Sequence, residues 1–500
     1  MDVSARMQQL RALISQGKGV PAASPPGIDA QQASAQAGTA GDNFAHVLQE
    51  LMQHASEMPN LIVRLPPPFG QIVQLALASS RGDAEECFTA AQEAVAVFHK
   101  HVEQGARTLG NSNWWLPVMR LLLRHLTQCA FAADTADRES RKDTSAGYRS
   151  PLERAVDSLM RLFRTSISAG KSEARQGASW RRSVRALPLA TVTLLFPLWF
   201  RMKNYSAGKT VPRVISQRQL VLRYPTKSLH VGGLPGSRGG ALGDTTDSLA
   251  TQELPTEASA AEVRQAIAEV ESRLDPDRRR VFPLCEYVEF EYYLGRFCLF
   301  EEEYDAAEKH LLEALRLCDW RQQANLQKIL MYLAPLQMMR GIFPSQQAAQ
   351  HLPTLITQLT HLVRHGLVAP LDDFLDEYML TLVDLGIWHI AERLRDVCLA
   401  RFLNSVFHAW LRGTTHCPWS QRKVLRLNML LDCCGAAGWR ATSDSLQARL
   451  TSLIRRKILR GYVAHGSALV IGPTRHAHPP GKPSDMQSIV LAPTYAKLKN

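Results

Sequence analysis

Basic side chains are concentrated towards the end of this 500-residue chain, and their chemistry is that of phosphate recognition. Residues 411–480 hold eleven Lys and Arg residues against two acidic ones, an excess of nine positive charges. Such groups donate to phosphate oxygens, and each neutralised phosphate releases counterions. Compensation of helix dipoles, at up to about 1 kcal/mol per charge, does not account for so large an excess. We expect RNA or DNA to contact Arg422, Lys423, Arg426, Arg440, Arg449, Arg455, Arg456, Lys457 and Arg460.

A helix is expected to present part of this basic set. Apolar residues recur with helical spacing from Leu446 to Ile458, after Thr442 and Ser443, which can cap a helix running to about Arg460. Arg449, Arg456 and Arg460 are separated by seven and four residues, which predicts that they stack on the opposite face. A solvated basic face without a ligand is the alternative that the pattern leaves open.

Other motifs that could carry chemistry are incomplete. The Gly-Lys-Ser/Thr triplets at 170–172 and 208–210 lack the first glycine of a phosphate-binding loop, because Thr165 and Lys203 stand there. No HExxH or GxSxG occurs, and the nine cysteines include no CxxC pair, which favours free thiols. The acidic cluster over 301–308 is expected to be a solvated turn. We therefore expect no catalytic residue, no metal and no cofactor. A nucleotide-hydrolysing enzyme ranks third among the hypotheses, after two non-enzymatic functions given below.

The elements that must position the basic set are mainly helical. Gly295, Ala307 and Leu311 have the spacing of one tetratricopeptide-like hairpin, in which small residues let two helices approach and leucine fills the groove. Further helices are expected over 324–340, 346–364, 371–384 and 387–412, punctuated by Pro344, Gly366 and Gly386. Consecutive helices of this kind predict a helical-repeat stack.

The last ordered segment changes character. We expect one helix over 420–437, the capped helix described above, and two short strands, Tyr462–His465 and Ala468–Ile471, around Gly466 and Ser467. The order helix, helix, two-stranded ribbon is typical of a winged helix.

Composition divides the chain into six parts. With 58 Lys and Arg against 46 Asp and Glu, its formal net charge is +12. The longest apolar run, residues 186–200, is too short to span a bilayer, which favours a buried pair of helices. The start lacks the apolar region of a secretory signal, so we expect a soluble intracellular protein. The predicted parts are a disordered segment (1–45), N-terminal helical repeats (46–203), a flexible Gly-rich basic insertion (204–255), further repeats (256–412), the winged helix (413–473) and a loose tail (474–500).

Several short motifs, in order along the chain, resemble the PCI-domain family. They are NWWLPVM at 113–119, YLGR at 293–296, KILMYLAPL at 328–336, ERLR at 392–395 and RGYVAH at 460–465. Together they extend over about residues 60–480. Lys457 stands where that family has a glycine, and we expect it to extend the preceding helix.

This resemblance implies a mainly α fold, a right-handed TPR-like stack of helical repeats that ends in a winged-helix PCI subdomain with a small β-ribbon. It also implies a non-enzymatic scaffold subunit of a nuclear mRNA-export assembly of the transcription-and-export complex 2 type. The implied partners are a larger PCI export scaffold protein of the germinal-centre-associated type, a small acidic disordered subunit of the proteasome-lid type, and RNA or DNA, but no membrane.

The implied location is the nucleus, including the nuclear envelope and pore, with a cytoplasmic fraction. The signalosome-associated PCI subunit has much of the same pattern. A protein-only subunit of a signalosome or proteasome-lid type complex is therefore the alternative.

Overall fold

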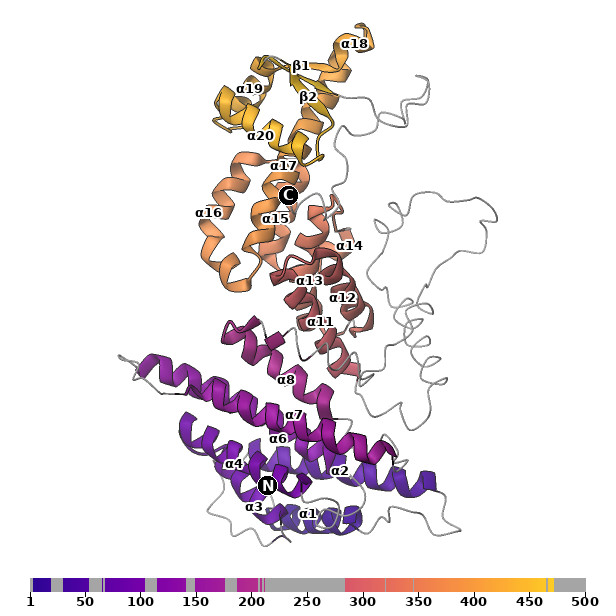
Figure 1. Ribbon diagram of the computed structural model, residues 1–500, viewed down its shortest axis with the longest axis vertical. Helices are drawn as coiled ribbons and strands as arrows, with labels where there is room; N and C mark the ends of the chain where they lie inside the picture. Colours follow the sequence, from indigo (N-terminus) through magenta and orange to yellow (C-terminus); the bar gives the residue numbers. More distant parts are fainter. Residues whose placement is uncertain are drawn as a thin grey trace. The chain divides into compact units, whose positions relative to one another are not determined.

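The computed structural model is mainly helical, with one small sheet (Figure 1). The described residues form two compact units, one made of those within 3–211 and 284–293 and the other of those within 294–471. Most of the predicted insertion over 204–255 and all of the predicted tail over 474–500 lie outside the described residues. The described residues are 3–18, 30–53, 65, 68–103, 115–140, 149–175, 187–205, 207–208, 211, 284–319, 321–344, 346–464 and 466–471.

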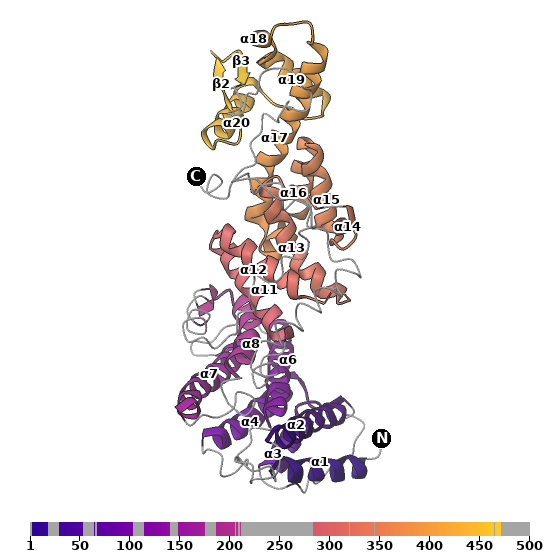
Figure 2. The ribbon, with the colours of Figure 1, turned by 90° about the vertical axis from the view of Figure 1, so that its right-hand side faces the viewer.

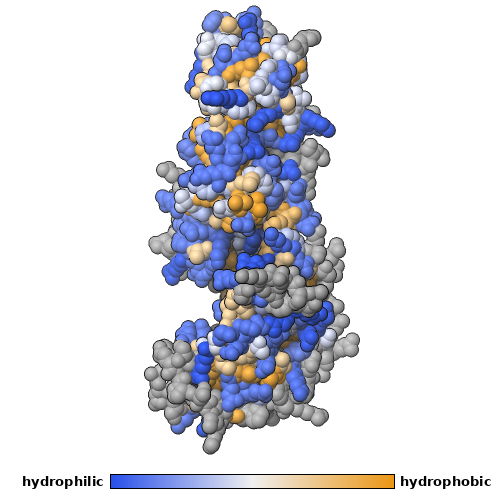
Figure 3. Space-filling view, turned by 90° about the vertical axis from the view of Figure 1, so that its left-hand side faces the viewer, coloured by the Kyte–Doolittle hydropathy of each residue, from blue (hydrophilic) through white to orange (hydrophobic). Residues whose placement is uncertain are grey.

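In the first unit, helices that follow one another in sequence pack side by side. Helix α1 packs on α2, α3 on α4, α4 on α6, α6 on α7 and α7 on α8 (Figures 1 and 2). Apolar side chains fill the interior, and the face of the molecule in Figure 3 is mostly hydrophilic. The helices are α1 (Val3–Lys18), α2 (Ala30–Gln53), α3 (Phe69–Ala78), α4 (Ala84–Glu103), α6 (Leu116–Ser140), α7 (Pro151–Arg175) and α8 (Leu187–Arg201).

The expectation of a disordered segment over 1–45 is wrong where the structure describes it. Helix α1 packs on α2, and Leu10 and Ile14 are buried with Phe44 and Leu48. The apolar residues of α1 are few, but they fall on one face and gain burial only against the second helix. Composition alone could not reveal that pairing. Residues 19–29 lie outside the described part.

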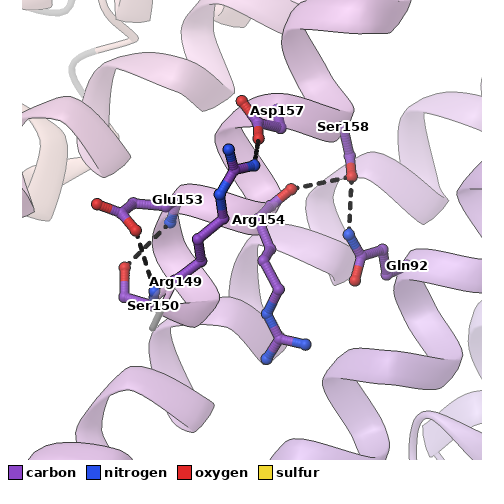
Figure 4. Close-up of polar contacts among 7 residues, drawn as sticks. All are labelled: Gln92, Arg149, Ser150, Glu153, Arg154, Asp157 and Ser158. Atoms are coloured by element: carbon purple, nitrogen blue, oxygen red, sulfur yellow. Dashed lines mark hydrogen bonds and ion pairs between the residues drawn. The ribbon is translucent and has the colours of Figure 1, made fainter. Parts of the chain in front are cut away.

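A capping box starts helix α7 (Figure 4). The Ser150 hydroxyl accepts the Glu153 backbone N–H at 3.2 Å, and the Glu153 carboxylate accepts the Ser150 N–H at 3.1 Å. Pro151 follows at the first helical position, where its missing N–H costs nothing. Gln92 of α4 donates to the Ser158 hydroxyl at 3.2 Å, which ties the two helices together. Local sequence therefore sets where α7 begins, and this contact helps to hold it against α4.

The apolar run at 186–200 is one helix, α8, and the predicted helix pair is wrong. Pro188 lies in its first turn, and Pro197 lies inside it. Leu189, Ala190 and Thr191 are consecutive, so they point to different sides of the helix, and all three are buried. An internal proline removes one helical hydrogen bond at a cost of about 3 kcal/mol, and burial of almost the whole helix surface offsets it.

The second unit contains most of the predicted repeat helices. Helix α11 (Leu284–Phe300) begins in the first unit and ends in the second, and it is followed by α12 (Tyr304–Leu317), α13 (Gln323–Met339), α14 (Gln346–Ala349), α15 (Thr354–His365), α16 (Val368–Leu385) and α17 (Trp388–Gly413). The single helix predicted over 346–364 is wrong, because the helical structure is interrupted between Ala349 and Thr354. A proline disfavours helical geometry in the residue before it.

The predicted close approach of α11 and α12 is confirmed. A Cβ placed on Gly295 would lie 2.6 Å from Leu311 Cγ and 3.3 Å from the Ala307 carbonyl oxygen. Gly366 and Gly386 end α15 and α16 in the left-handed conformation, with φ of 69° and 75°, as predicted for residues that terminate helices. Glycine adopts this conformation without the steric cost that a Cβ brings.

The end of the second unit holds a three-stranded antiparallel sheet of strand order β1-β3-β2 (Figure 2). Its elements are α18 (Trp419–Arg422), β1 (Val424–Arg426), α19 (Leu427–Ala436), α20 (Ser443–Arg455), β2 (Gly461–Ala464) and β3 (Ala468–Ile471). We call residues 413–471 the C-terminal module. The two predicted strands are confirmed to within a residue or two.

The single helix predicted over 420–437 is wrong, because β1 interrupts it. Val424 pairs with Val470 and Leu425 with Leu469, and the Ile471 N–H donates to the Lys423 carbonyl at 2.9 Å. Three residues carry too little local pattern to predict a strand. Their partner lies more than forty residues further along the chain, so tertiary pairing decides their conformation.

Candidate nucleic-acid interface

Helix α20 carries the middle of the basic set, and its start is as predicted. The Thr442 hydroxyl accepts the Ser445 N–H at 3.2 Å, and the Ser445 hydroxyl accepts the Thr442 N–H at 3.0 Å. Leu446, Leu450 and Leu453 are buried. This face anchors the helix, so the remaining residues of α20 are turned away from the core.

The end of α20 differs from the prediction. The helix stops at Arg455, and Lys457 adopts a left-handed conformation with φ of 58°. The Lys457 N–H donates to the Ile454 carbonyl and the Ile458 N–H to the Leu453 carbonyl, both at 2.9 Å. Ile458 and Leu459 are buried, and only a sharp turn brings them into the core. The expectation that Lys457 extends the helix is therefore wrong.

The predicted stack of Arg449, Arg456 and Arg460 on one helix face is also wrong. Arg456 caps the C-terminal end, and Arg460 lies beyond the turn, just before β2. Only Arg449 belongs to the regular part of α20. The physical reason is that burial of the residues after Lys457 overrides the helical periodicity of the charges.

Three members of the set bind other parts of the protein. Arg422 donates to the Leu411 carbonyl at 3.0 Å, and the Arg449 guanidinium lies over the Trp439 ring, 5.0 Å from its centroid. Arg456 forms an ion pair with Asp396 of α17. Burial raises the pKa of the Asp396 carboxyl, although Arg456, Arg449 and Arg393 lower it. These arginines have structural roles, whatever else they contact.

Four other members are exposed cations on the surface of the C-terminal module: Arg426, Arg440, Arg455 and Lys457. Lys423 and Arg460 are half-buried. Among the described residues, no ion pair or hydrogen bond engages the side chains of the four exposed cations. They are the part of the predicted set that is available to an external anion.

Sequence reasoning missed an exposed aromatic residue on the same module. Tyr462 on the edge strand β2 is 59% exposed. It pairs with Val470, which pairs in turn with Val424, and Arg426 lies two residues further along β1. Because side chains alternate between the faces of a strand, Tyr462 and Arg426 share the outer face, opposite buried Leu425 and Leu469. The register of the sheet determines that Tyr462 lies on this face, and the sequence alone does not give that register.

Two other candidate sites of the sequence have structural explanations, whereas the triplet at 208–210 lies mostly outside the described residues. Residues 170–172 lie inside helix α7, where a phosphate-binding loop does not form. In the acidic cluster, Glu308 is buried and pairs with Arg340 at 2.6 Å, while Glu302 pairs with Arg393 at 3.1 Å, so the expectation of a wholly solvated turn is wrong.

Neither a metal site nor a membrane span is found in the part of the chain that the structure describes. No group of three or more His, Cys, Asp or Glu side chains there is arranged to hold a metal ion. None of the described helices combines the length and apolar character that crossing a membrane requires.

Comparison with known proteins confirms the predicted resemblance to PCI-domain proteins. The chain is 20% identical to PCI domain-containing protein 2 of Danio rerio over 455 residues, 91% of this chain and 95% of the relative. A homolog of that protein in Drosophila melanogaster is 31% identical over 127 residues, 25% of this chain and 32% of the relative. The protein CSN12 homolog of Mycosarcoma maydis is 23% identical over 410 residues, 79% of this chain and 75% of the relative. No family model matches the chain.

Proposed function

We propose that this protein is a non-enzymatic PCI scaffold subunit of a nuclear mRNA-export assembly of the transcription-and-export complex 2 type. In this proposal the helices form a right-handed repeat stack, and the C-terminal module is a winged helix that binds RNA or DNA. The partners are a larger PCI scaffold protein and a small acidic disordered subunit. The similarity to PCI domain-containing protein 2 over 91% of this chain supports the assignment.

The observation that carries nucleic-acid binding is the group of exposed cations on the C-terminal module. Arg426, Arg440, Arg455 and Lys457 have no acidic partner among the described residues, and Tyr462 lies exposed on the same module. Clustered cations attract a polyanion through counterion release, and an exposed aromatic ring offers a stacking surface for a base. The cations contact the nucleic-acid backbone, the ring contacts a base, and both kinds of contact depend little on sequence.

Binding of single-stranded RNA over a salt series tests this proposal. We expect simultaneous replacement of Arg426, Arg440, Arg455 and Lys457 by glutamine to weaken binding at least tenfold. The slope of log affinity against log salt should fall by about 3, because each phosphate contact on a single strand contributes about 0.7. The matched control replaces four exposed cations elsewhere by glutamine, namely Arg161, Arg164, Lys309 and Lys328. Equal effects of the two variants would contradict an interface on the module.

A protein-only subunit of a signalosome or proteasome-lid type complex is the second candidate. The similarity to the protein CSN12 homolog over 79% of this chain favours it. Affinity purification with mass spectrometry, combined with RNA crosslinking, separates the two candidates. Signalosome or lid subunits without crosslinked RNA would support the second, whereas an export scaffold with crosslinked RNA would support the first.

Localisation follows from the first candidate. We expect the protein in the nucleus and at the nuclear envelope and pore, with a cytoplasmic fraction, and imaging of a fluorescent fusion would check this. A protein confined to the cytoplasm would contradict an export role.

A further inference from the structure

Helix α16 is the most acidic element of the second unit, in a chain whose formal net charge is +12. It contains Asp372, Asp373, Asp376, Glu377 and Asp384, and no basic residue. Asp372 pairs with Arg395 of α17 at 2.9 Å. The other four carboxylates are exposed, and no ion pair with another described residue engages them. The outer face of α16 therefore carries a negative charge that the described parts of the fold leave uncompensated.

This charge distribution opposes the stability of the helix itself. Asp373 and Glu377 are four residues apart, a spacing at which like charges repel. Asp384 lies in the last turn, where the helix dipole is negative and no basic residue is present. Glu377 also raises the pKa of the neighbouring Tyr378 phenol. Local choices that conflict with the fold are expected where a sequence serves a partner.

Apolar side chains are exposed on the same helix. Five large apolar side chains among the described residues are exposed, and four of them belong to α16 or to its N-cap, Leu367. Met379 is 43% exposed, Leu380 72% and Val383 51%. Figure 3 looks onto the side of Figure 1 on which α16 lies, and apolar atoms interrupt the hydrophilic surface at the height of this helix.

The inner face of α16 is already occupied, so the exposed residues belong to a distinct surface. Leu371, Phe374, Leu375 and Leu382 are buried, and the helix packs on α15 and α17. Met379, Leu380 and Val383 form the centre of the outer face. Asp376 and Glu377 precede them by one turn and Asp384 follows them, so the apolar centre has acidic groups at both ends.

We propose that this outer face of α16 docks a basic amphipathic helix of a partner protein. The apolar face of such a helix covers Leu380 and Val383, and its Lys or Arg residues pair with Asp376, Glu377 and Asp384. Nucleic acid and anionic lipid are repelled by the same carboxylates. The surface is thus complementary in charge to a different class of partner from that of the C-terminal module, and it does not depend on the proposed nucleic-acid binding.

A designed peptide serves as the probe. It is a fluorescent helix of about 14 residues, with leucine at i, i+3, i+4 and i+7 and lysine elsewhere, and its binding to the full chain is followed by anisotropy. We expect Leu380→Ser with Val383→Ser to weaken binding about tenfold, because apolar burial is lost. Asp376→Asn with Glu377→Gln should weaken it as well, and rising salt should abolish that difference.

Two controls distinguish docking from general attraction. Glu392→Gln with Asp432→Asn removes two exposed carboxylates outside α16 and should leave binding unchanged. A peptide of the same composition in scrambled order should bind at least tenfold more weakly. Equal binding of both peptides, or equal effects of the two acidic pairs, would overturn the proposal.

The oligomeric state gives a second way to overturn it. Analytical ultracentrifugation should find the same state for the full chain and for Leu380→Asp. A dimer that dissociates on Leu380→Asp would show that a second copy, not a partner protein, covers the helix.

Discussion

The guanidinium of Arg456 pairs with the carboxylate of Asp396, and this contact connects the C-terminal module to helix α17. The neighbouring Arg455 is exposed on the surface of the module. The two arginines are adjacent and look equivalent in the sequence, but Arg456 faces a half-buried carboxylate and Arg455 faces the solvent. Their difference separates the stability of the module from its capacity to bind an anion.

Replacing Arg456 by glutamine is expected to lower the free energy of unfolding by about 1–3 kcal/mol at neutral pH. The half-buried Asp396 carboxylate would lose its main partner. Denaturant unfolding measures the change, and Arg455→Gln is the control that should leave the midpoint unaltered. If the stability losses of the two variants are equal, the ion pair contributes nothing specific.

The loss caused by Arg456→Gln should depend on pH. Burial raises the folded-state pKa of Asp396 above its unfolded value. Between the two values the folded chain binds more protons, so stability falls as pH rises through the folded pKa. Removing Arg456 raises that pKa further. The difference in stability between the variant and the wild type should therefore shrink as the pH falls and Asp396 takes up a proton, and a difference constant down to pH about 4 would refute this.

Replacing Lys457 by glycine should raise the free energy of unfolding by about 0.5–1 kcal/mol while weakening RNA binding. A lysine at φ of 58° bears a steric cost that glycine avoids. The lost charge should lower the salt slope for single-stranded RNA by about 0.7. Lys457→Ala is the matched control, because it removes the charge and keeps the Cβ. It should weaken RNA binding equally without the gain in stability.

Replacing Tyr462 by alanine should weaken binding of single-stranded RNA about tenfold, since stacking on one base contributes about 1–3 kcal/mol. Tyr462→Phe keeps the ring and should bind nearly as tightly as the wild type. Affinity for duplex RNA, whose bases are already stacked, should not change. An equal loss of affinity with both substitutions would rule out a stacking role for Tyr462. That outcome would not contradict the proposed phosphate contacts of the exposed cations.

Replacing Gly295 by alanine should destabilise the second unit by about 1–2 kcal/mol, because the added Cβ would overlap Leu311. At Gly435, inside helix α19, an added Cβ would meet no atom within 4 Å. Gly435→Ala should therefore stabilise the chain by up to about 1 kcal/mol through helix propensity alone. Thermal unfolding distinguishes the two signs, and stabilisation by both would show that α11 and α12 tolerate a wider separation.

Much of the helical framework could be predicted because its signals are local. Gly366 and Gly386 lie where only a left-handed residue ends the helix well, and Thr442 can cap α20 through its own hydroxyl. The small residue Gly295 and the large residue Leu311 are sixteen positions apart in one hairpin. In each case the residues that decide the structure are near one another in sequence.

The division of the basic set could not be predicted. All nine residues have the same charge, and Arg455, Arg456 and Lys457 are consecutive in the sequence. Which of them meets Asp396, sixty positions earlier, depends on how α20 ends and on what it packs against. The exposure of Tyr462 depends in the same way on the register of β2 with β3.

The amino-acid sequence by itself determined the helical character, the helix cap at Thr442, the helix ends at Gly366 and Gly386, the concentration of positive charge near residue 450 and the resemblance to PCI-domain proteins. Periodicity, backbone preference and net charge are properties of neighbouring residues. The tertiary structure alone decided that β1 is a strand, that Lys457 turns the chain, that Arg456 is committed to Asp396, and that α16 exposes an acidic and apolar face. Pairing and burial depend on residues far apart in the chain, and for these short segments they outweigh the local preference.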